Sequence, residues 1–147
     1  MKEDTVRVAM RTFRADIDQT TLLCVFVADT LRDAGIPEKF LPVMEMATDE
    51  IFSNIAKHAY GNDPARNAED AVVVTLSVEG GVIELTFSDQ AKAFNPLSVP
   101  SPDVDKGADR EPGGLGIYLA RSVMDDMRYS RREGRNVLTL VKLTGDV

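Results

Sequence analysis

Three polar residues with chemically useful side chains share one face of a predicted helix. Glu50, Asn54 and His58 are spaced four residues apart, and residues at this spacing lie one above another on a helix surface. A carboxylate and an amide oxygen one turn apart suit a general base beside Mg²⁺, which takes few protein ligands and completes its shell with phosphates and water. The same spacing is also typical of a solvated helix face, and His58 by itself is typical of a structural histidine.

A glycine-rich stretch, Gly113-Gly114-Leu115-Gly116, precedes another predicted helix. Glycines there let backbone N–H groups approach an anion, which the positive end of the helix dipole also favours. Helix capping and tight packing explain such glycines equally well. The stretch is not a Walker A loop, because no Gly-Lys-Ser/Thr follows. It is not a Rossmann fingerprint either, because no parallel βαβ unit surrounds it.

A third candidate is Asp89, at the end of an apolar strand and within the stretch SDQAKAFNPL. A carboxylate at a strand end can accept a hydrogen bond from the amino group of a ligand. It can equally cap the turn that follows the strand. Asp89 alone does not distinguish these interpretations.

The elements that must position these residues follow from hydrophobic periodicity. Alternating apolar residues and turn signals predict strands over 5–13, 71–78, 82–88, 128–133 and 136–143. Apolar residues at helical spacing predict helices over 18–34, 42–60 and 117–127. Glu79-Gly80-Gly81 and Gly134 indicate two hairpins. This order predicts an α+β fold, a two-layer sandwich with an antiparallel or mixed sheet and helices on one face.

Four of the seven prolines, Pro96, Pro100, Pro102 and Pro112, fall within residues 95–112. A structureless stretch of this length is uncommon inside a compact domain and is usually functional. The segment leads directly into the glycine-rich stretch. We therefore expect it to take part in the same site.

Composition limits the classes of function. The chain has 147 residues, enough for one domain, with a net charge of −7, which argues against general binding to nucleic acid or an anionic membrane. Its single cysteine, Cys24, excludes an internal disulfide and a thiolate metal cluster. The acidic start and the lack of a long apolar run predict a cytoplasmic protein.

Four arginines, Arg128, Arg131, Arg132 and Arg135, cluster on the last predicted hairpin. Such a cluster is compatible with nucleic-acid binding. In a chain of net charge −7, with acidic residues beside the arginines, a solvated edge or a partner-docking face is the favoured interpretation.

The three candidate segments also occur in the order and spacing of a known family. DEIFSNIAKHAY, SDQAKAFNP and GGLGIYLARSVMDDM resemble the N-box, G1 box and G2 box of the Bergerat-fold, histidine-kinase-like ATPases. The likeness is closest to the stand-alone anti-sigma factor serine/threonine kinases. It covers about residues 5–143 of a single domain over 1–147. The absence of a dimerisation and phosphotransfer helix pair, and the single histidine lying inside the N-box, argue against a complete sensor histidine kinase.

The resemblance implies a role for each matching residue. Glu50 is expected to be the catalytic base, Asn54 to hold Mg²⁺ against the triphosphate, and Asp89 to accept from the adenine amino group. Residues 95–113 are expected to form the ATP lid. The further implied ATP contacts are His58, Ala91, Phe94, Arg110, Gly113, Gly114, Leu115 and Gly116. Arg110 is a candidate γ-phosphate contact, or alternatively a solvated loop cation.

One residue departs from the family pattern. The G1 box reads Asp-x-Gly-x-x-Phe, and Ala91 stands where this glycine belongs. A methyl group there could crowd the nucleotide or require a φ that alanine disfavours. The departure puts ATP affinity in question more than the fold.

The implied function is transfer of the γ-phosphate of Mg-ATP to a serine or threonine of a small anti-anti-sigma antagonist. The resemblance also implies sequestration of a partner such as a sigma factor, and it allows a homodimer. Neither nucleic acid nor a membrane is an expected partner. Two alternatives stay open: a nucleotide-dependent or degenerate binding module without phosphotransfer, and a kinase whose target lies outside transcription.

Overall fold

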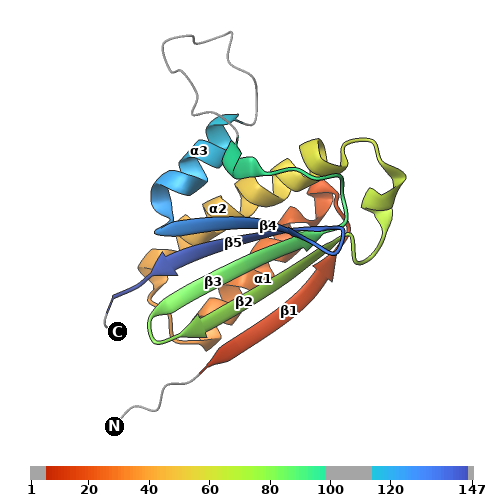
Figure 1. Cartoon of the computed structure of the whole chain (residues 1–147). Helices are drawn as coiled ribbons and strands as arrows, with labels where there is room; N and C mark the ends of the chain where they lie inside the picture. The colour runs from red at the N-terminus through yellow and green to blue at the C-terminus, as the bar shows by residue number, and fades with distance from the viewer. Residues whose placement is uncertain (1–5, 99–113, 146–147) are drawn as a thin grey trace.

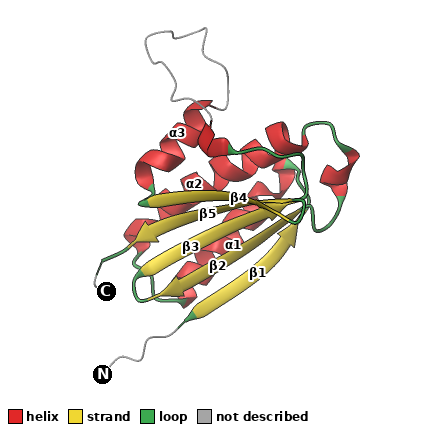
Figure 2. Cartoon of the chain, viewed as in Figure 1, coloured by secondary structure: helices red, strands yellow, loops and turns green. Residues whose placement is uncertain are grey.

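Five strands form one antiparallel sheet, and three α-helices lie against one of its faces (Figures 1 and 2). These are the elements of residues 6–98 and 114–145, the part of the chain that the computed structural model describes. The strands are β1 (Arg7–Phe13), β2 (Val72–Glu79), β3 (Val82–Asp89), β4 (Asp126–Arg132) and β5 (Arg135–Leu143). The helices are α1 (Thr20–Asp33), α2 (Leu41–Asn54) and α3 (Gly114–Val123). The predicted α+β class is confirmed.

The sheet has the strand order β1-β2-β3-β5-β4, with every neighbouring pair antiparallel. Both predicted hairpins are present. Gly80 and Gly81 have φ of 56° and 77°, and Glu133 and Gly134 have φ of 52° and 76°. Two successive residues with positive φ match the right-handed twist of the flanking strands. The order places β3 and β5 side by side, although α3 and β4 separate them in sequence.

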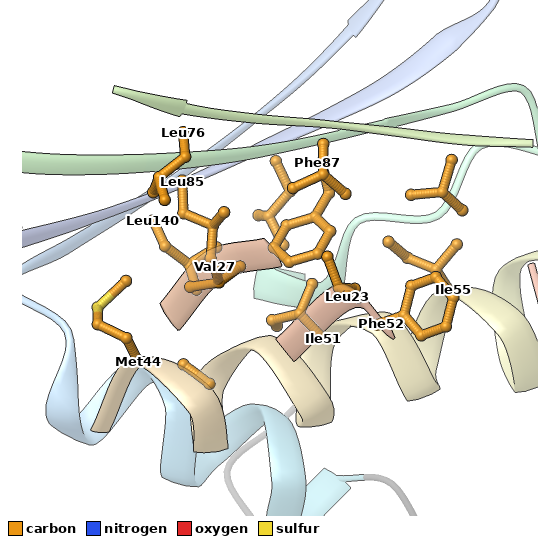
Figure 3. Close-up of a cluster of buried hydrophobic side chains, with 14 of the residues drawn as sticks. Leu23, Val27, Met44, Ile51, Phe52, Ile55, Leu76, Leu85, Phe87 and Leu140 are labelled. Carbon is orange, nitrogen blue, oxygen red and sulfur yellow. The ribbon is translucent and has the colours of Figure 1, made fainter. Parts of the chain in front are cut away.

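The core lies between the sheet and helices α1 and α2. Inward residues alternate along the strands, so that Leu76, Leu85 and Leu140 are fully buried. Figure 3 shows these leucines facing Val27 and Met44 from the helices. A strand with one buried face has this period of two.

No helix within residues 6–98 and 114–145 lies against the other face of the sheet (Figure 1). Val8 and Met10 on β1 are 64% and 66% exposed. They pair with Ser77 and Thr75 of β2, and residues opposite one another share a face of the sheet. The apolar alternation in β1 therefore points away from the core.

The third helix differs from its prediction at both ends. It spans Gly114–Val123 rather than 117–127, and Asp126 already belongs to β4. The Asp125 N–H donates to the carbonyl of Val141, and the Asp125 carboxylate accepts from the N–H of Leu143. Pairing with β5 thus ends the helix earlier than its local pattern predicts.

The second helix also changes character within its predicted range. Regular α-helix ends at Asn54, and Ile55–Tyr60 continue as a π-helix that stops at Gly61, with φ of 56°. Within the described ranges, no helix has both the length and the apolar character that crossing a membrane requires.

Candidate functional site

A narrow pocket lies where α2, the end of β3 and the start of β5 meet. Its volume is about 20 Å³, which holds about one water molecule. A larger ligand therefore requires the lining side chains to move apart. Those side chains are Ile51, Asn54, Ile55, Asp89, Phe94, Pro96, Tyr129, Asn136 and Leu138. The pocket thus combines apolar walls with a few polar groups, which is typical of small-molecule sites.

Asp89 is the buried carboxylate of this pocket, with 3% of its surface exposed. Its Oδ1 accepts from the Ala91 N–H at 3.0 Å and from the Asn136 Nδ2 at 2.9 Å. No donor among the described residues hydrogen-bonds to Oδ2. Burial raises the pKa of Asp89, an effect that these two bonds and the positive charges of Arg131 and Arg135 partly oppose. Oδ2 is therefore available to a ligand N–H.

Asn54 presents an oxygen to the same pocket. Its side chain is 5% exposed, and its Nδ2 donates to the backbone carbonyl of Glu50 at 2.8 Å. Because a carbonyl only accepts, this bond places the nitrogen on the helix side, and no donor in the described part of the chain hydrogen-bonds to Oδ1. An amide oxygen suits Mg²⁺. The described residues contain no group of three or more His, Cys, Asp or Glu side chains that could hold a metal, so a cation here would depend on ligand phosphates and water.

Glu50 lies directly against Gly116 of α3. A Cβ built on Gly116 would collide with the Glu50 carboxylate and come within 3.0 Å of its Cδ. Gly116 is the third residue of α3, so the carboxylate is held beside the first turn of that helix. Free backbone N–H groups gather at such a turn and favour negative charge.

His58 does not join these residues. It is exposed on the π-helical segment Ile55–Tyr60 and is not part of the pocket lining. A π-helix closes its turns from i to i+5, so the predicted polar line at i, i+4 and i+8 ends at Asn54. Contact between His58 and ATP stays a prediction.

Ala91 fits its position without strain. It is 1% exposed, and Glu133 is the only non-glycine residue with positive φ in the described ranges. Its N–H donates to Asp89, and its carbonyl accepts from the Arg131 Nη1 at 2.8 Å. The expected conflict between alanine and its φ is therefore wrong. Ala91 lies behind the pocket, outside its lining.

The other predicted contacts divide into two groups. Phe94 lines the pocket and is half-buried. Gly114 and Leu115 open α3 immediately before Gly116. Arg110 and Gly113 lie outside the described residues, as does most of the predicted lid, at 99–113.

Sequence reasoning missed a polar cluster behind Asp89, centred on Asn136. This amide is 4% exposed and bonds to Asp89, Tyr129 and Arg131. A signal was present, because Asn136 precedes the apolar Leu138 and Leu140 at a spacing of two residues. A polar residue on the core face of a strand requires buried partners.

Three of the four arginines of the last hairpin, Arg128, Arg131 and Arg132, are exposed, as a solvated edge implies, but Arg131 and Arg135 also bond to neighbouring residues. Arg131 bonds to Ala91 and Asn136, and Arg135 donates to the Ser88 hydroxyl at 2.7 Å. Arg128 forms an exposed pair with Glu84 at 3.1 Å. Arg131 therefore belongs to the surroundings of the candidate site.

Sequence comparison finds a family with this architecture. The family model described as a histidine kinase-like ATPase domain matches residues 13–142. The serine/threonine-protein kinase BtrW of Bordetella bronchiseptica is 34% identical over 98 residues, which cover 66% of each chain. The serine-protein kinase RsbW of Bacillus cereus is 30% identical over 129 residues, covering 84% of this chain and 78% of the relative. These relatives are serine kinases, the class that the sequence resemblance implied.

Solved structures share the fold. The RsbU and RsbW domains of Rv1364c from Mycobacterium tuberculosis align with a TM-score of 0.65 over 92% of this chain and 32% of that longer chain. A chain of the SiaB-SiaC complex from Pseudomonas aeruginosa aligns with a TM-score of 0.63 over 92% of this chain and 89% of that one. Sequence identity is 15% in both cases.

Proposed function

The chain belongs to the histidine kinase-like ATPase domain family, and from this premise we propose that it is an ATP-dependent protein serine/threonine kinase. Its pocket would take the adenine base of Mg-ATP, with the phosphates toward α3. The observation that carries the proposal is that Asp89 and Asn54 line one pocket, while Glu50, one helical turn before Asn54, lies against Gly116 of α3.

Each group has a task that suits its chemistry. The buried Asp89 carboxylate accepts from the exocyclic amino group of adenine. The first turn of α3 supplies backbone N–H groups for phosphate oxygens. The Asn54 Oδ1 would hold Mg²⁺, which when bound offsets the negative charge of the phosphates. Phosphoryl transfer mainly requires this positioning and charge stabilisation.

Glu50 is the proposed general base. Its carboxylate accepts the proton of the attacking serine or threonine hydroxyl as the new O–P bond forms and the bond to the ADP leaving group breaks. Its position beside the first turn of α3, where we propose that the phosphates bind, supports this role.

We further propose that the substrate is a small antagonist protein of the anti-anti-sigma type, and that the chain sequesters a sigma factor when the antagonist is phosphorylated. The serine-protein kinase relatives and the family resemblance of the three boxes support this assignment. We also propose that the reaction takes place in the cytoplasm, as the family resemblance implies.

The direct test is incubation with γ-labelled ATP, Mg²⁺ and candidate antagonist proteins. Label on a serine or threonine of the antagonist is the expected result, with the Glu50→Ala protein as the control for contaminating kinases. Tight ATP binding without transfer would favour the non-catalytic partner switch instead. No binding of ATP or ADP at millimolar concentration would overturn both.

A further inference from the structure

We propose that Asn136 is a positioning residue that fixes the Asp89 carboxylate and thereby sets the preference of the pocket for a 6-amino purine over a 6-oxo purine. This inference rests on the proposed ATP-binding function. Asn136 and Asp89 are direct partners in the β3–β5 register, and paired residues in neighbouring strands have Cβ atoms about 4.5–5.5 Å apart. Their side chains thus meet inside the core face of the sheet.

The amide nitrogen of Asn136 is fully used. Nδ2 donates to the Asp89 Oδ1 and to the backbone carbonyl of Lys92, each at 2.9 Å. An amide nitrogen carries two hydrogens, so neither is left for a ligand. One side chain therefore binds both the carboxylate and the loop that follows it.

The amide oxygen of Asn136 is also occupied. It accepts from the N–H of Phe94 at 3.1 Å, from the Arg131 Nη1 at 3.1 Å and from the Tyr129 hydroxyl. Three donors saturate a carbonyl oxygen. Asn136 thus lines the pocket but can influence a ligand only through its neighbours.

These bonds of Asn136 fix the orientation of the Asp89 carboxylate. With Oδ1 held by Asn136 and by the Ala91 N–H, the carboxylate cannot rotate without breaking two bonds. Oδ2 is left as an acceptor of fixed direction. The amino group of adenine can donate to this oxygen. A 6-oxo purine would instead place its carbonyl oxygen beside Oδ2, and two buried acceptors would then face each other without a hydrogen bond.

The test compares two variants of nearly the same shape. Asn136→Val and Asn136→Thr both remove the bonds to Lys92 and Phe94, but only the threonine hydroxyl can still donate to Asp89. We expect ATP to bind about tenfold more weakly to the valine variant than to the threonine variant. GTP affinity, measured by the same calorimetry, should not differ between them.

Thr139→Val is the matched control. It lies on the same strand and removes a side-chain hydrogen bond, to Thr86 at 3.1 Å. Thr139 pairs with Thr86, which is three residues before Asp89 on β3. Because successive residues of a strand alternate between faces, this pair lies on the other face of the sheet from Asp89. The ratio of ATP to GTP affinity should stay at the wild-type value.

A pH profile separates positioning from a general structural role. The charged or titratable groups that act on Asp89 are Arg131 from β4, Arg135 from β5 and Tyr60 from the π-helix. The bond from Asn136 lowers the pKa of Asp89 against the effect of burial. Its loss in Asn136→Val should raise the pH below which ATP binding fails, and Asn136→Thr should restore it toward the wild-type value.

Urea unfolding establishes that each variant is folded, and Asn136→Leu replaces Asn136→Val if the latter is not. If the valine and threonine variants had the same ratio of ATP to GTP affinity and the same pH midpoint of ATP binding, this inference would be overturned and the proposed function would stand. If the valine variant lost ATP and GTP affinity equally relative to the threonine variant, the inference would also be overturned, because such a loss would indicate a purely structural role for Asn136. Failure of the wild-type chain to bind ATP would overturn the proposed function, and this inference with it.

Discussion

At the scale of single residues, Asp89 carries two opposing properties. It is almost fully buried, yet its hydrogen bonds within the described chain reach only one of its oxygens. A buried carboxylate that lacks water binds a matching donor more strongly than an exposed one does. The same burial makes its charge costly to the folded state and raises its pKa. The proposed role of Asp89 in ATP binding and its effect on the stability of the fold are therefore in conflict.

Asp89→Asn should resolve the conflict in favour of stability. The amide oxygen still accepts from Asn136 and Ala91, while the buried charge is gone. Because the folded pKa exceeds the ordinary value of 3.8, the native state binds more protons between the two values, and wild-type stability falls as pH rises through that window. At pH values above this window, the variant should therefore have a higher free energy of unfolding than the wild type, as measured by urea unfolding.

The same substitution should weaken ATP binding about 10- to 150-fold, the range for a hydrogen bond that involves a charged group. Calorimetry measures this loss. Equal unfolding free energies for the two proteins at neutral pH would contradict the argument from burial, and wild-type affinity would contradict the assigned contact.

Glu50→Ala should separate binding from chemistry. A general base acts in the transition state, so its removal should slow phosphotransfer about 10²- to 10⁴-fold and leave ATP affinity nearly unchanged. Asn54→Ala is the comparison, because it should weaken the Mg-nucleotide complex itself. Transfer at the wild-type rate by the Glu50→Ala protein would refute the role of Glu50.

At the scale of elements, the site depends on the contact between α2 and α3. The register of the two helices sets the Glu50 carboxylate against Gly116, where a Cβ has no room. The π-helical segment that follows α2 then turns His58 into solvent and buries Tyr60, whose hydroxyl donates to the Ala71 carbonyl and accepts from the Gln90 N–H. The end of this helix is thus fixed to the strand end that carries Asp89.

Gly116→Ala should displace the Glu50 carboxylate. Alanine favours a helix over glycine by about 1 kcal/mol, so the variant alone should keep α3 but lose phosphotransfer as the base is moved. In the Glu50→Ala background the collision is absent, and Gly116→Ala should stabilise the protein by up to about 1 kcal/mol.

A double-mutant cycle on unfolding free energy measures this coupling. The stabilising effect of Gly116→Ala should be clearly larger without the Glu50 side chain than with it. Identical effects in both backgrounds would mean that the carboxylate moves away freely, and that Gly116 does not position it.

At the scale of the whole molecule, the sheet is buried on one face only. Leu76 on β2 is fully buried against the helices, whereas Met10 on the neighbouring β1 is 66% exposed on the other face. Burial of apolar surface is the main stabilising contribution to folding, so the two faces should contribute very unequally.

Leu76→Ala should lower the free energy of unfolding by about 2–5 kcal/mol, because it leaves a cavity in the core. Met10→Ala should change it by no more than about 0.5 kcal/mol, as for most exposed positions. Urea unfolding of the two variants compares them directly. A loss above about 2 kcal/mol for Met10→Ala would show that the outer face is covered in solution.

Several features could be predicted from sequence because they depend on residues close together in the chain. The alternation in 71–78 and 82–88 predicts the central strands, and Glu79-Gly80-Gly81 predicts their turn, in which both glycines have the positive φ that such a turn requires. Glu50 and Asn54 are one helical turn apart wherever the helix packs. The order of the three boxes predicted the family and, through it, the fold.

Other features depended on contacts between distant segments. Asn136 and Asp89 are 47 residues apart in sequence, and only the β3–β5 pairing brings them together. The same applies to Gly116 beside Glu50, and to the end of α3, where pairing of the next residues with β5 prevails over helical periodicity. Local propensities amount to a few tenths of a kcal/mol per residue, whereas leaving a buried polar group unsatisfied costs about 1–3 kcal/mol. The tertiary structure therefore decided how the candidate site is held, while the sequence alone determined which residues were available to form it.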